Sequence, residues 1–131
     1  MVIDTSALLA MLLGEAEAER MVGAIAADPV RLVGTPTLVE AAAVMTARHG
    51  RGGEVALDAL AERLSLETVP FSADAASFAR DGYRRYGRGV GDPGVLNLGD
   101  CFAYGLAMAL DEPLLFKGDD FVRTDVRPVA Y

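Results

Sequence analysis

The sequence predicts an α/β protein with a mostly parallel central sheet that helices cover on both faces. Short apolar segments alternate along the chain with longer segments of strong helix formers, and the first of them, Met1–Asp4, runs directly into helix-compatible sequence. Strands separated by helices pair in parallel through right-handed crossovers. The chain has 131 residues, so we expect one domain over residues 1–131.

The first half of the chain contains two strand-to-helix alternations. Its expected elements are a strand at Met1–Asp4, a helix at Thr5–Leu13 that stops at Gly14, a helix at Glu15–Ala27 and a strand at Val30–Val33. Thr35 is an N-cap candidate, and Pro36 suits the first position of the next helix. This helix should reach about Arg48, because Gly50 and the Gly52-Gly53 pair end it.

The second half continues the alternation around a glycine-rich loop. The expected elements are a helix at Glu54–Leu64, a strand at Leu66–Phe71 interrupted by Pro70, a helix capped by Ser72 that runs to Tyr86, a loop at Gly87–Gly94, a helix capped by Asn97 that reaches about Leu110, a strand at Leu114–Lys117 and an edge strand at Pro128–Ala130. Ligands of such sheets bind beyond the carboxyl ends of the strands. Side chains that follow strands are therefore the first candidates for a functional site.

The composition narrows the classes of function. The net charge is −7, from 12 Lys and Arg against 19 Asp and Glu, which argues against a protein that coats nucleic acid nonspecifically. Cys101 is the only cysteine and His49 the only histidine, which excludes an internal disulfide and a thiolate zinc site and favours a cytoplasmic protein. The opening apolar stretch is far shorter than the ~20 residues of a membrane span, so we expect neither a signal peptide nor an anchor.

Carboxylates interrupt apolar sequence in four motifs, namely VIDTSALLA with Asp4, TPTLVEAAAVM with Glu40, LNLGDCFAYGLAMAL with Asp100, and LLFKGDDFVRTDV with Asp119-Asp120. Each has a structural alternative. Asp4 can cap a helix, Glu40 can extend into solvent, Asp100 can form a capping box with Asn97, and the Asp119-Asp120 pair can mark a solvated turn. Together the motifs favour a site, because three of them place an acid where a strand ends or a helix begins.

Carboxylates that converge must take up a proton or bind a cation. Two of them ~4 Å apart repel by about 4 kcal/mol at an effective dielectric constant of about 20. Oxygen-only ligands select hard ions, chiefly Mg²⁺ or Mn²⁺, and these ions keep waters and bind phosphate groups of substrates. The acids therefore predict metal-dependent phosphoryl-transfer chemistry.

In their order and spacing, the four motifs resemble those of the PIN-domain ribonucleases, specifically the VapC-type toxins of bacterial type II toxin–antitoxin pairs. The resemblance covers nearly the whole chain. It implies an α/β/α sandwich and a Mg²⁺-dependent endoribonuclease, in which Mn²⁺ can substitute, that cleaves single-stranded RNA with a metal-activated water. It also implies a homodimer, and a VapB-type antitoxin that blocks the site in a hetero-oligomer, with no role for a membrane.

Matching the motifs by position assigns the family's functional roles to residues of this chain. The resemblance implies that Asp4 and Asp100 are the main metal carboxylates, that Glu40 is a further catalytic acid, and that the Ser6 hydroxyl supports the site and its substrate. It places the fourth catalytic acid at Asp119, with the adjacent Asp120 as the alternative.

An arginine-rich segment, RDGYRRYGRG, precedes the glycine loop and offers a substrate track. Single-stranded RNA is held by cations on phosphates and by aromatic rings under unstacked bases. We expect the substrate contacts at Arg84, Arg85 and Arg88, beside Tyr83 and Tyr86. The alternative is a solvated helix end at which arginines complement the helix dipole.

Two competing functions remain open at this point. A haloacid-dehalogenase-like phosphatase also places an Asp after its first strand, but it needs a second Asp two residues later, where this chain has Ser6. A non-catalytic dimerisation or antitoxin-binding module with a degenerate site is the other alternative, and the presence of all four acids argues against it.

Overall fold

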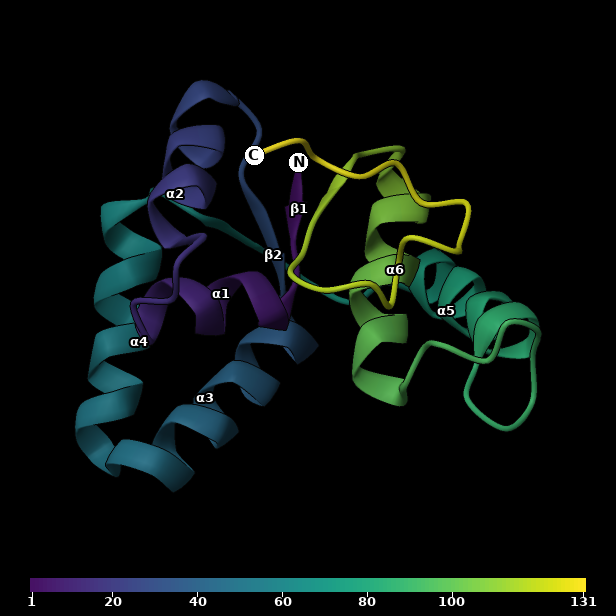
Figure 1. The fold of residues 1–131 in the computed structure, drawn as a ribbon, viewed down its shortest axis with the longest axis horizontal. Coiled ribbons are helices and arrows are strands. Elements are labelled where there is room, and N and C mark those ends of the chain that lie inside the picture. The colour runs from purple at the N-terminus through teal and green to yellow at the C-terminus, as the bar shows by residue number, and fades with distance from the viewer.

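Six helices and four short strands make up the computed structural model, which describes all of residues 1–131 (Figure 1). In chain order they are β1 (Val2–Ile3), α1 (Thr5–Leu12), α2 (Ala18–Ala27), β2 (Leu32–Gly34), α3 (Thr35–His49), α4 (Arg51–Arg63), β3 (Glu67–Val69), α5 (Ala73–Tyr86), α6 (Leu98–Leu110) and β4 (Leu114–Leu115). The predicted α/β class is confirmed. None of the helices has the length and apolar character that crossing a membrane requires.

The strands are all parallel and lie in the order β3-β2-β1-β4. The first two crossovers move the chain one way across the sheet, and the third returns past β1 to β4. Because such crossovers are right-handed, this reversal places the helices of the third crossover on the opposite face. Figure 1 accordingly shows α1 to α4 on one side of the sheet and α5 and α6 on the other, so the fold is the predicted α/β/α sandwich.

Successive strand residues enter different cores. Val2 and Leu114 belong to the core beneath α5 and α6, whereas Ile3 and Leu115 belong to the core beneath α1 to α4. This is the two-residue period of a strand buried on both faces, and it explains why these strands are uniformly apolar. Asp4, the polar residue that follows β1, therefore lies at the edge of both cores.

Two predicted helix boundaries around α3 and α4 are wrong. Gly34, not Thr35, occupies the N-cap position of α3, and no side chain caps this helix. The break between α3 and α4 is made by Gly50 alone, at φ 58°, and the Gly52-Gly53 pair lies inside α4. Gly53 is needed there because a Cβ would stand 2.3 Å from the carbonyl oxygen of Met45, so the glycine lets α4 begin against the end of α3.

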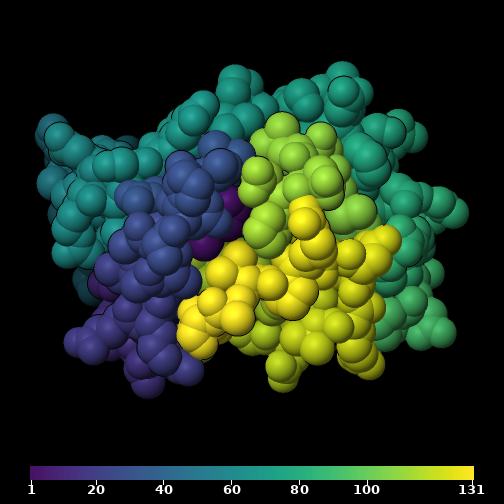
Figure 2. Space-filling model, turned by 90° about the horizontal axis from the view of Figure 1, so that it is seen from above, coloured from purple at the N-terminus to yellow at the C-terminus, as the bar shows by residue number.

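The carboxyl-terminal segment after β4 spreads over one face of the molecule, shown in yellow between the N-terminal helices and the green of α6 in Figure 2. The predicted edge strand at Pro128–Ala130 is wrong. Pro128 forms only an isolated parallel bridge with Leu114, since proline lacks the N–H that a continuing ladder requires. The predicted caps of α5 and α6, Ser72 and Asn97, are confirmed.

Candidate active site

Asp4 stands at the point where β1 becomes α1. Its backbone N–H still donates to the carbonyl of Leu115, at 2.9 Å, while its side chain caps the helix. The backbone N–H of Ser6 (2.9 Å) and the Ser6 hydroxyl (2.6 Å) both donate to Oδ2 of Asp4. The other oxygen, Oδ1, accepts no comparable bond, although the residue is only 3% exposed.

The Ser6 hydroxyl connects two strand ends. While it donates to Asp4, it accepts a 2.9 Å hydrogen bond from the backbone N–H of Lys117, two residues after β4. The Ser6 hydroxyl therefore holds Asp4 against the segment that carries Asp119 and Asp120.

Glu40, on α3, lies against the first turn of α6. The Thr5 hydroxyl donates to Oε2 of Glu40 at 2.7 Å. Oε1 is only 2.3 Å from the place where a Cβ on Gly99 would stand. Thr5 and Gly99 therefore fix the Glu40 carboxylate beside the residue that precedes Asp100.

Asp100 forms the predicted capping box at the start of α6. Its Oδ2 accepts from the backbone N–H of Asn97 at 2.7 Å, and its own N–H donates to the Asn97 side chain at 2.9 Å. The capping alternative is thus confirmed for both Asp4 and Asp100. In each case the cap occupies one carboxylate oxygen and leaves the other available for a ligand.

The electrostatics of these acids match a like-charge cluster. Burial raises the pKa of Asp4, and the negative charge of Glu40 adds to the effect. Burial likewise raises the pKa of Asp100 to about 6, with further contributions from Asp4 and Asp120. Such a site favours neutral carboxyl groups or a bound cation, and perturbed acids of this kind are typical of functional sites.

The structure separates the two candidates for the fourth acid. Asp119 is exposed and makes no side-chain hydrogen bond or ion pair. Asp120 accepts from Nη2 of Arg88 with both oxygens, each at 3.2 Å, and its charge acts on Asp100. The geometry therefore favours Asp120 over Asp119.

The donor set fits a hard divalent ion, although the acids are not drawn together around a single point. No three of the Asp, Glu, His or Cys side chains are close enough to hold a metal ion among them. The free oxygens of Asp4 and Asp100 are nonetheless the hard donors that Mg²⁺ and Mn²⁺ prefer, and Mg²⁺ commonly binds through one or two carboxylates plus waters and phosphates.

The three expected substrate arginines have different surroundings. Arg84 is 74% exposed and pairs only with Asp81. Arg85 lies 2.8 Å from the carboxylate of Asp125, in the carboxyl-terminal segment. Arg88 donates through Nε to the carbonyl of Val95 at 2.8 Å and pairs with Asp120. Of these three arginines, Arg88 is thus the one that contacts a candidate site acid, Asp120.

Two residues with contacts around the candidate site, Gly99 and Asp125, were not identified from the sequence. Gly99 carried a possible signal, because a glycine in a first helical turn beside Asp100 suggests a close approach by another group. Asp125 offered no local signal, since its partners on α5 and α6 are distant in sequence. Cys101, which follows Asp100, is a core thiol: the residue is 1% exposed, and burial raises its pKa to about 11.

Comparisons with known proteins identify the family to which the chain belongs. The family model described as the PIN domain matches residues 1–127. The chain belongs to the PIN-domain family. Among curated PIN-domain relatives, Ribonuclease VapC30 of Mycobacterium tuberculosis is 50% identical over 130 residues, which cover 99% of this chain and 98% of the relative. Ribonuclease VapC of Mycolicibacterium smegmatis is 50% identical over 129 residues, which cover 98% and 99% respectively.

Solved structures support the PIN fold. The crystal structure of VapC20 of M. tuberculosis, described as a toxin that cleaves the sarcin-ricin loop, superposes with a TM-score of 0.75 at 20% identity and covers 97% of this chain and 98% of that chain. VapBC2 from Rickettsia felis, bound to a DNA fragment from its promoter, gives a TM-score of 0.75 at 15% identity and covers 98% and 96%. The sequence relatives therefore make this chain a VapC-type protein, and the solved structures show its PIN fold.

Proposed function

We propose that this VapC-type protein is a Mg²⁺-dependent endoribonuclease and the toxin of a type II toxin–antitoxin pair. The observation that carries the proposal is the shared geometry of Asp4 and Asp100. Each uses one carboxylate oxygen to cap a helix and keeps the other unbonded, in a site where burial and neighbouring charges raise both pKa values. Two isolated helix caps would not act on each other, whereas the charge of Asp4 contributes to the raised pKa of Asp100.

In this proposal each acid has a definite task. Asp4 and Asp100 would hold the ion, and the Ser6 and Asn97 hydrogen bonds fix the orientation of the two carboxylates. When bound, a divalent ion polarises the phosphodiester and lowers the pKa of the attacking water. Glu40, held by Thr5, is positioned to orient that water or to accept its proton.

Arg88 and Arg84 are the RNA contacts that the geometry supports. Arg88 lies beside Asp120 and partly offsets the negative charge around Asp100, so a substrate phosphate can be drawn to it at the rim of the acids. Arg84 is largely exposed on α5, where its only partner is one residue of its own helix. Both can exchange a weak surface pair for a phosphate at low cost.

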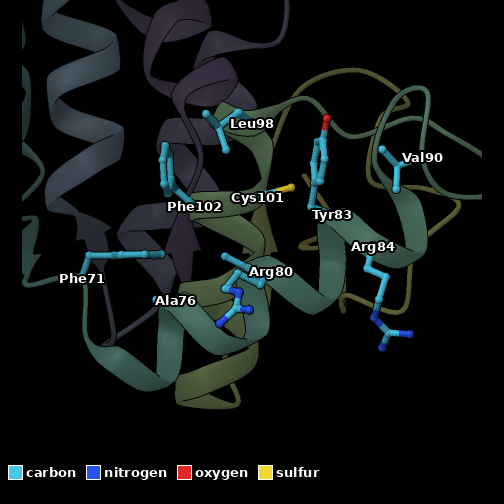
Figure 3. A pocket seen from close by; sticks show the side chains of 10 residues that line it. Phe71, Ala76, Arg80, Tyr83, Arg84, Val90, Leu98, Cys101 and Phe102 are labelled. Carbon is cyan, nitrogen blue, oxygen red and sulfur yellow. The ribbon is translucent and has the colours of Figure 1, made fainter.

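A second copy of the chain and a VapB-type antitoxin are the proposed protein partners, and RNA is the proposed substrate. An apolar cavity of about 420 Å³ between α5 and α6 supports the homodimer. Figure 3 shows Phe102 and Tyr83 on opposite sides of it, with Leu98 and Cys101 between them. Leu98 is 66% exposed, which is unusual for a leucine unless another surface covers it. Toxin–antitoxin complexes are among the structures that share this fold, which supports the antitoxin.

The deciding experiment measures RNA cleavage and thermal stability with and without metal. Purified protein should cleave a single-stranded RNA in Mg²⁺ or Mn²⁺, lose the activity in chelator and regain it when metal is added. The same ions should raise the melting temperature, because a ligand that binds only the folded state stabilises it. Full cleavage by metal-stripped protein would refute the mechanism.

The same assay tests the non-catalytic alternative. A degenerate module would bind antitoxin while showing neither cleavage nor a metal-dependent melting shift. The absence of a preformed three-acid cluster is the observation that favours this reading. A metal-induced shift that Asp4→Asn abolishes would exclude it.

A further inference from the structure

The turn that carries Asp119 and Asp120 is anchored by the carboxylate of Asp125, which follows the turn in the sequence. Asp125 accepts a 2.8 Å hydrogen bond from the Tyr104 hydroxyl with Oδ1, and Nη1 of Arg85 lies 2.8 Å from Oδ2. Tyr104 is on α6 and Arg85 is on α5. One side chain therefore ties the carboxyl-terminal segment to both helices of this layer.

Both partners of Asp125 are themselves held rigidly. Tyr104 is 1% exposed, and its ring packs against Gly82 so closely that a Cβ there would lie 2.5 Å from it. The Arg85 guanidinium stacks over the Tyr86 ring, 4.6 Å from its centroid, and also contacts the Tyr86 hydroxyl. Although partial burial opposes it, hydrogen bonding to Tyr104 and Arg85 keeps the pKa of Asp125 below its usual value, so the anchor is charged at neutral pH.

Residues 118–124, the turn that precedes Asp125, have few other side-chain connections. Phe121 is buried and packs on Phe116, with ring centroids 4.9 Å apart. The Thr124 hydroxyl donates to the Phe121 carbonyl at 2.8 Å, which closes the turn on itself. Arg88 then pairs with Asp120. Asp125 and Phe121 thus fix the turn that carries Asp120, whose negative charge acts on Asp100.

We propose that Asp125 is a positioning residue for RNA cleavage, which holds residues 118–124 so that Asp120 faces Asp100. The inference rests on the proposed function and deepens it. Asp125 acts through Asp120 and has no contact of its own with substrate or metal. Arg85 belongs to the same anchor, so it contributes to catalysis by fixing this turn, whereas Arg84 and Arg88 meet the RNA.

The test compares three variants with the wild-type chain. Asp125→Ala removes the anchor, and Tyr104→Phe removes only the hydroxyl that binds it. Asp81→Ala is the matched control, because Asp81 also pairs with Arg85, at 3.5 Å, but lies within α5 and contacts no residue of the turn. For each protein the measurements are hydrogen–deuterium exchange of residues 118–124, Mn²⁺ affinity by paramagnetic resonance, and kcat and KM for RNA well below the melting temperature.

Asp125→Ala should accelerate exchange in residues 118–124, weaken Mn²⁺ binding and lower kcat by about 10- to 100-fold, the usual effect of losing a residue that orients site ligands. KM for RNA should change less than about twofold, because the phosphate-binding arginines remain. Tyr104→Phe should show the same pattern to a smaller degree. Asp81→Ala also frees Arg84, so it serves as the control for the turn alone and should keep wild-type exchange in residues 118–124, Mn²⁺ affinity and kcat. A residue with a merely structural role would lower the melting temperature without changing kcat or Mn²⁺ affinity.

The outcomes distinguish a failure of the proposed function from a failure of the positioning role of Asp125. If the wild-type chain neither binds Mn²⁺ nor cleaves RNA, the proposed function fails and this inference falls with it. If the wild type is active and both Asp125→Ala and Tyr104→Phe retain its Mn²⁺ affinity and kcat, the proposed function stands and the positioning role is overturned. Should Asp125→Ala not fold, Tyr104→Phe decides alone.

Discussion

At the scale of single residues, the same carboxylates serve structure and chemistry. The sequence presented capping and metal binding at Asp100 as alternatives, yet Oδ2 makes the cap and Oδ1 remains unbonded. Asp4 divides its two oxygens in the same way. A helix N-terminus also favours a negative group through its dipole, which partly offsets the repulsion between the acids. Capping therefore orients the site and does not compete with it.

Asp100→Asn separates the two roles. Asn is as good a cap acceptor as Asp, so α6 should begin as before. RNA cleavage and the Mg²⁺-induced rise in melting temperature should both collapse, because the variant lacks one of the two metal carboxylates. Cleavage assays and thermal melts with and without Mg²⁺ measure both effects. Cleavage close to the wild-type rate would remove Asp100 from the site.

The raised pKa of Asp100 also predicts how the stability of the metal-free protein depends on pH. The pKa of Asp100 in the folded protein is about 6, against the ordinary value of 3.8, so folding favours the protonated carboxyl. The stability contribution is complete below about pH 4 and is lost as the pH rises through about 6. Melting temperatures of the metal-free wild type should therefore fall across this window, and Asp100→Asn should flatten the fall. An identical pH profile in the two proteins would contradict the assignment.

A matched pair of substitutions identifies the fourth acid. Asp120→Asn should reduce cleavage strongly, since Asp120 is the acid whose charge reaches Asp100. Asp119→Asn removes the same charge from an exposed neighbour and should have a small effect. Parallel cleavage assays at saturating Mg²⁺ distinguish them. The opposite ranking would restore Asp119, the position that motif comparison favoured.

At the scale of elements, the site depends on how closely α6 approaches α3. The sequence was sufficient to predict α6 and its cap, because Asn97 and Asp100 stand three residues apart at the start of an apolar stretch. It could not show that Glu40 and Gly99 meet, because these residues are 59 positions apart and their contact depends on how α3 and α6 pack on the sheet. Local patterns specify elements, whereas contacts between elements follow from packing.

Gly99→Ala tests this approach directly. The new methyl group would displace the Glu40 carboxylate, which lies 2.3 Å from its position. Since that carboxylate ends a flexible side chain, unfolding free energy should change by less than about 1 kcal/mol, while cleavage falls clearly. Gly23→Ala on α2 is the control, because nothing lies within 4 Å of the added methyl group. It should stabilise the protein by about 0.5–1 kcal/mol and leave cleavage unchanged. Equal activity of both variants would show that Glu40 does not need its present position.

At the scale of the whole molecule, strand order explains where the site forms. The reversal after β3 brings β4 beside β1, so the residues after these two strands meet through the Ser6 hydroxyl and the Lys117 N–H. The sequence predicted this convergence because parallel sheets bind ligands beyond their carboxyl ends. It did not predict the anchoring of the carboxyl-terminal segment to α5 and α6, because that anchoring depends on side-chain contacts between residues distant in sequence.

The layer of α5 and α6 also leads to the last prediction, which concerns assembly. The exposed Leu98 borders the apolar cavity on this layer, so Leu98→Lys should turn a dimer into a monomer in sedimentation experiments. Val55→Lys is the matched control, because Val55 is 59% exposed on α4, across the sheet, and gains the same charge. It should leave the dimer intact. A wild-type chain that stays monomeric at high micromolar concentration, or a dimer that survives Leu98→Lys, would show that a second copy does not cover this cavity.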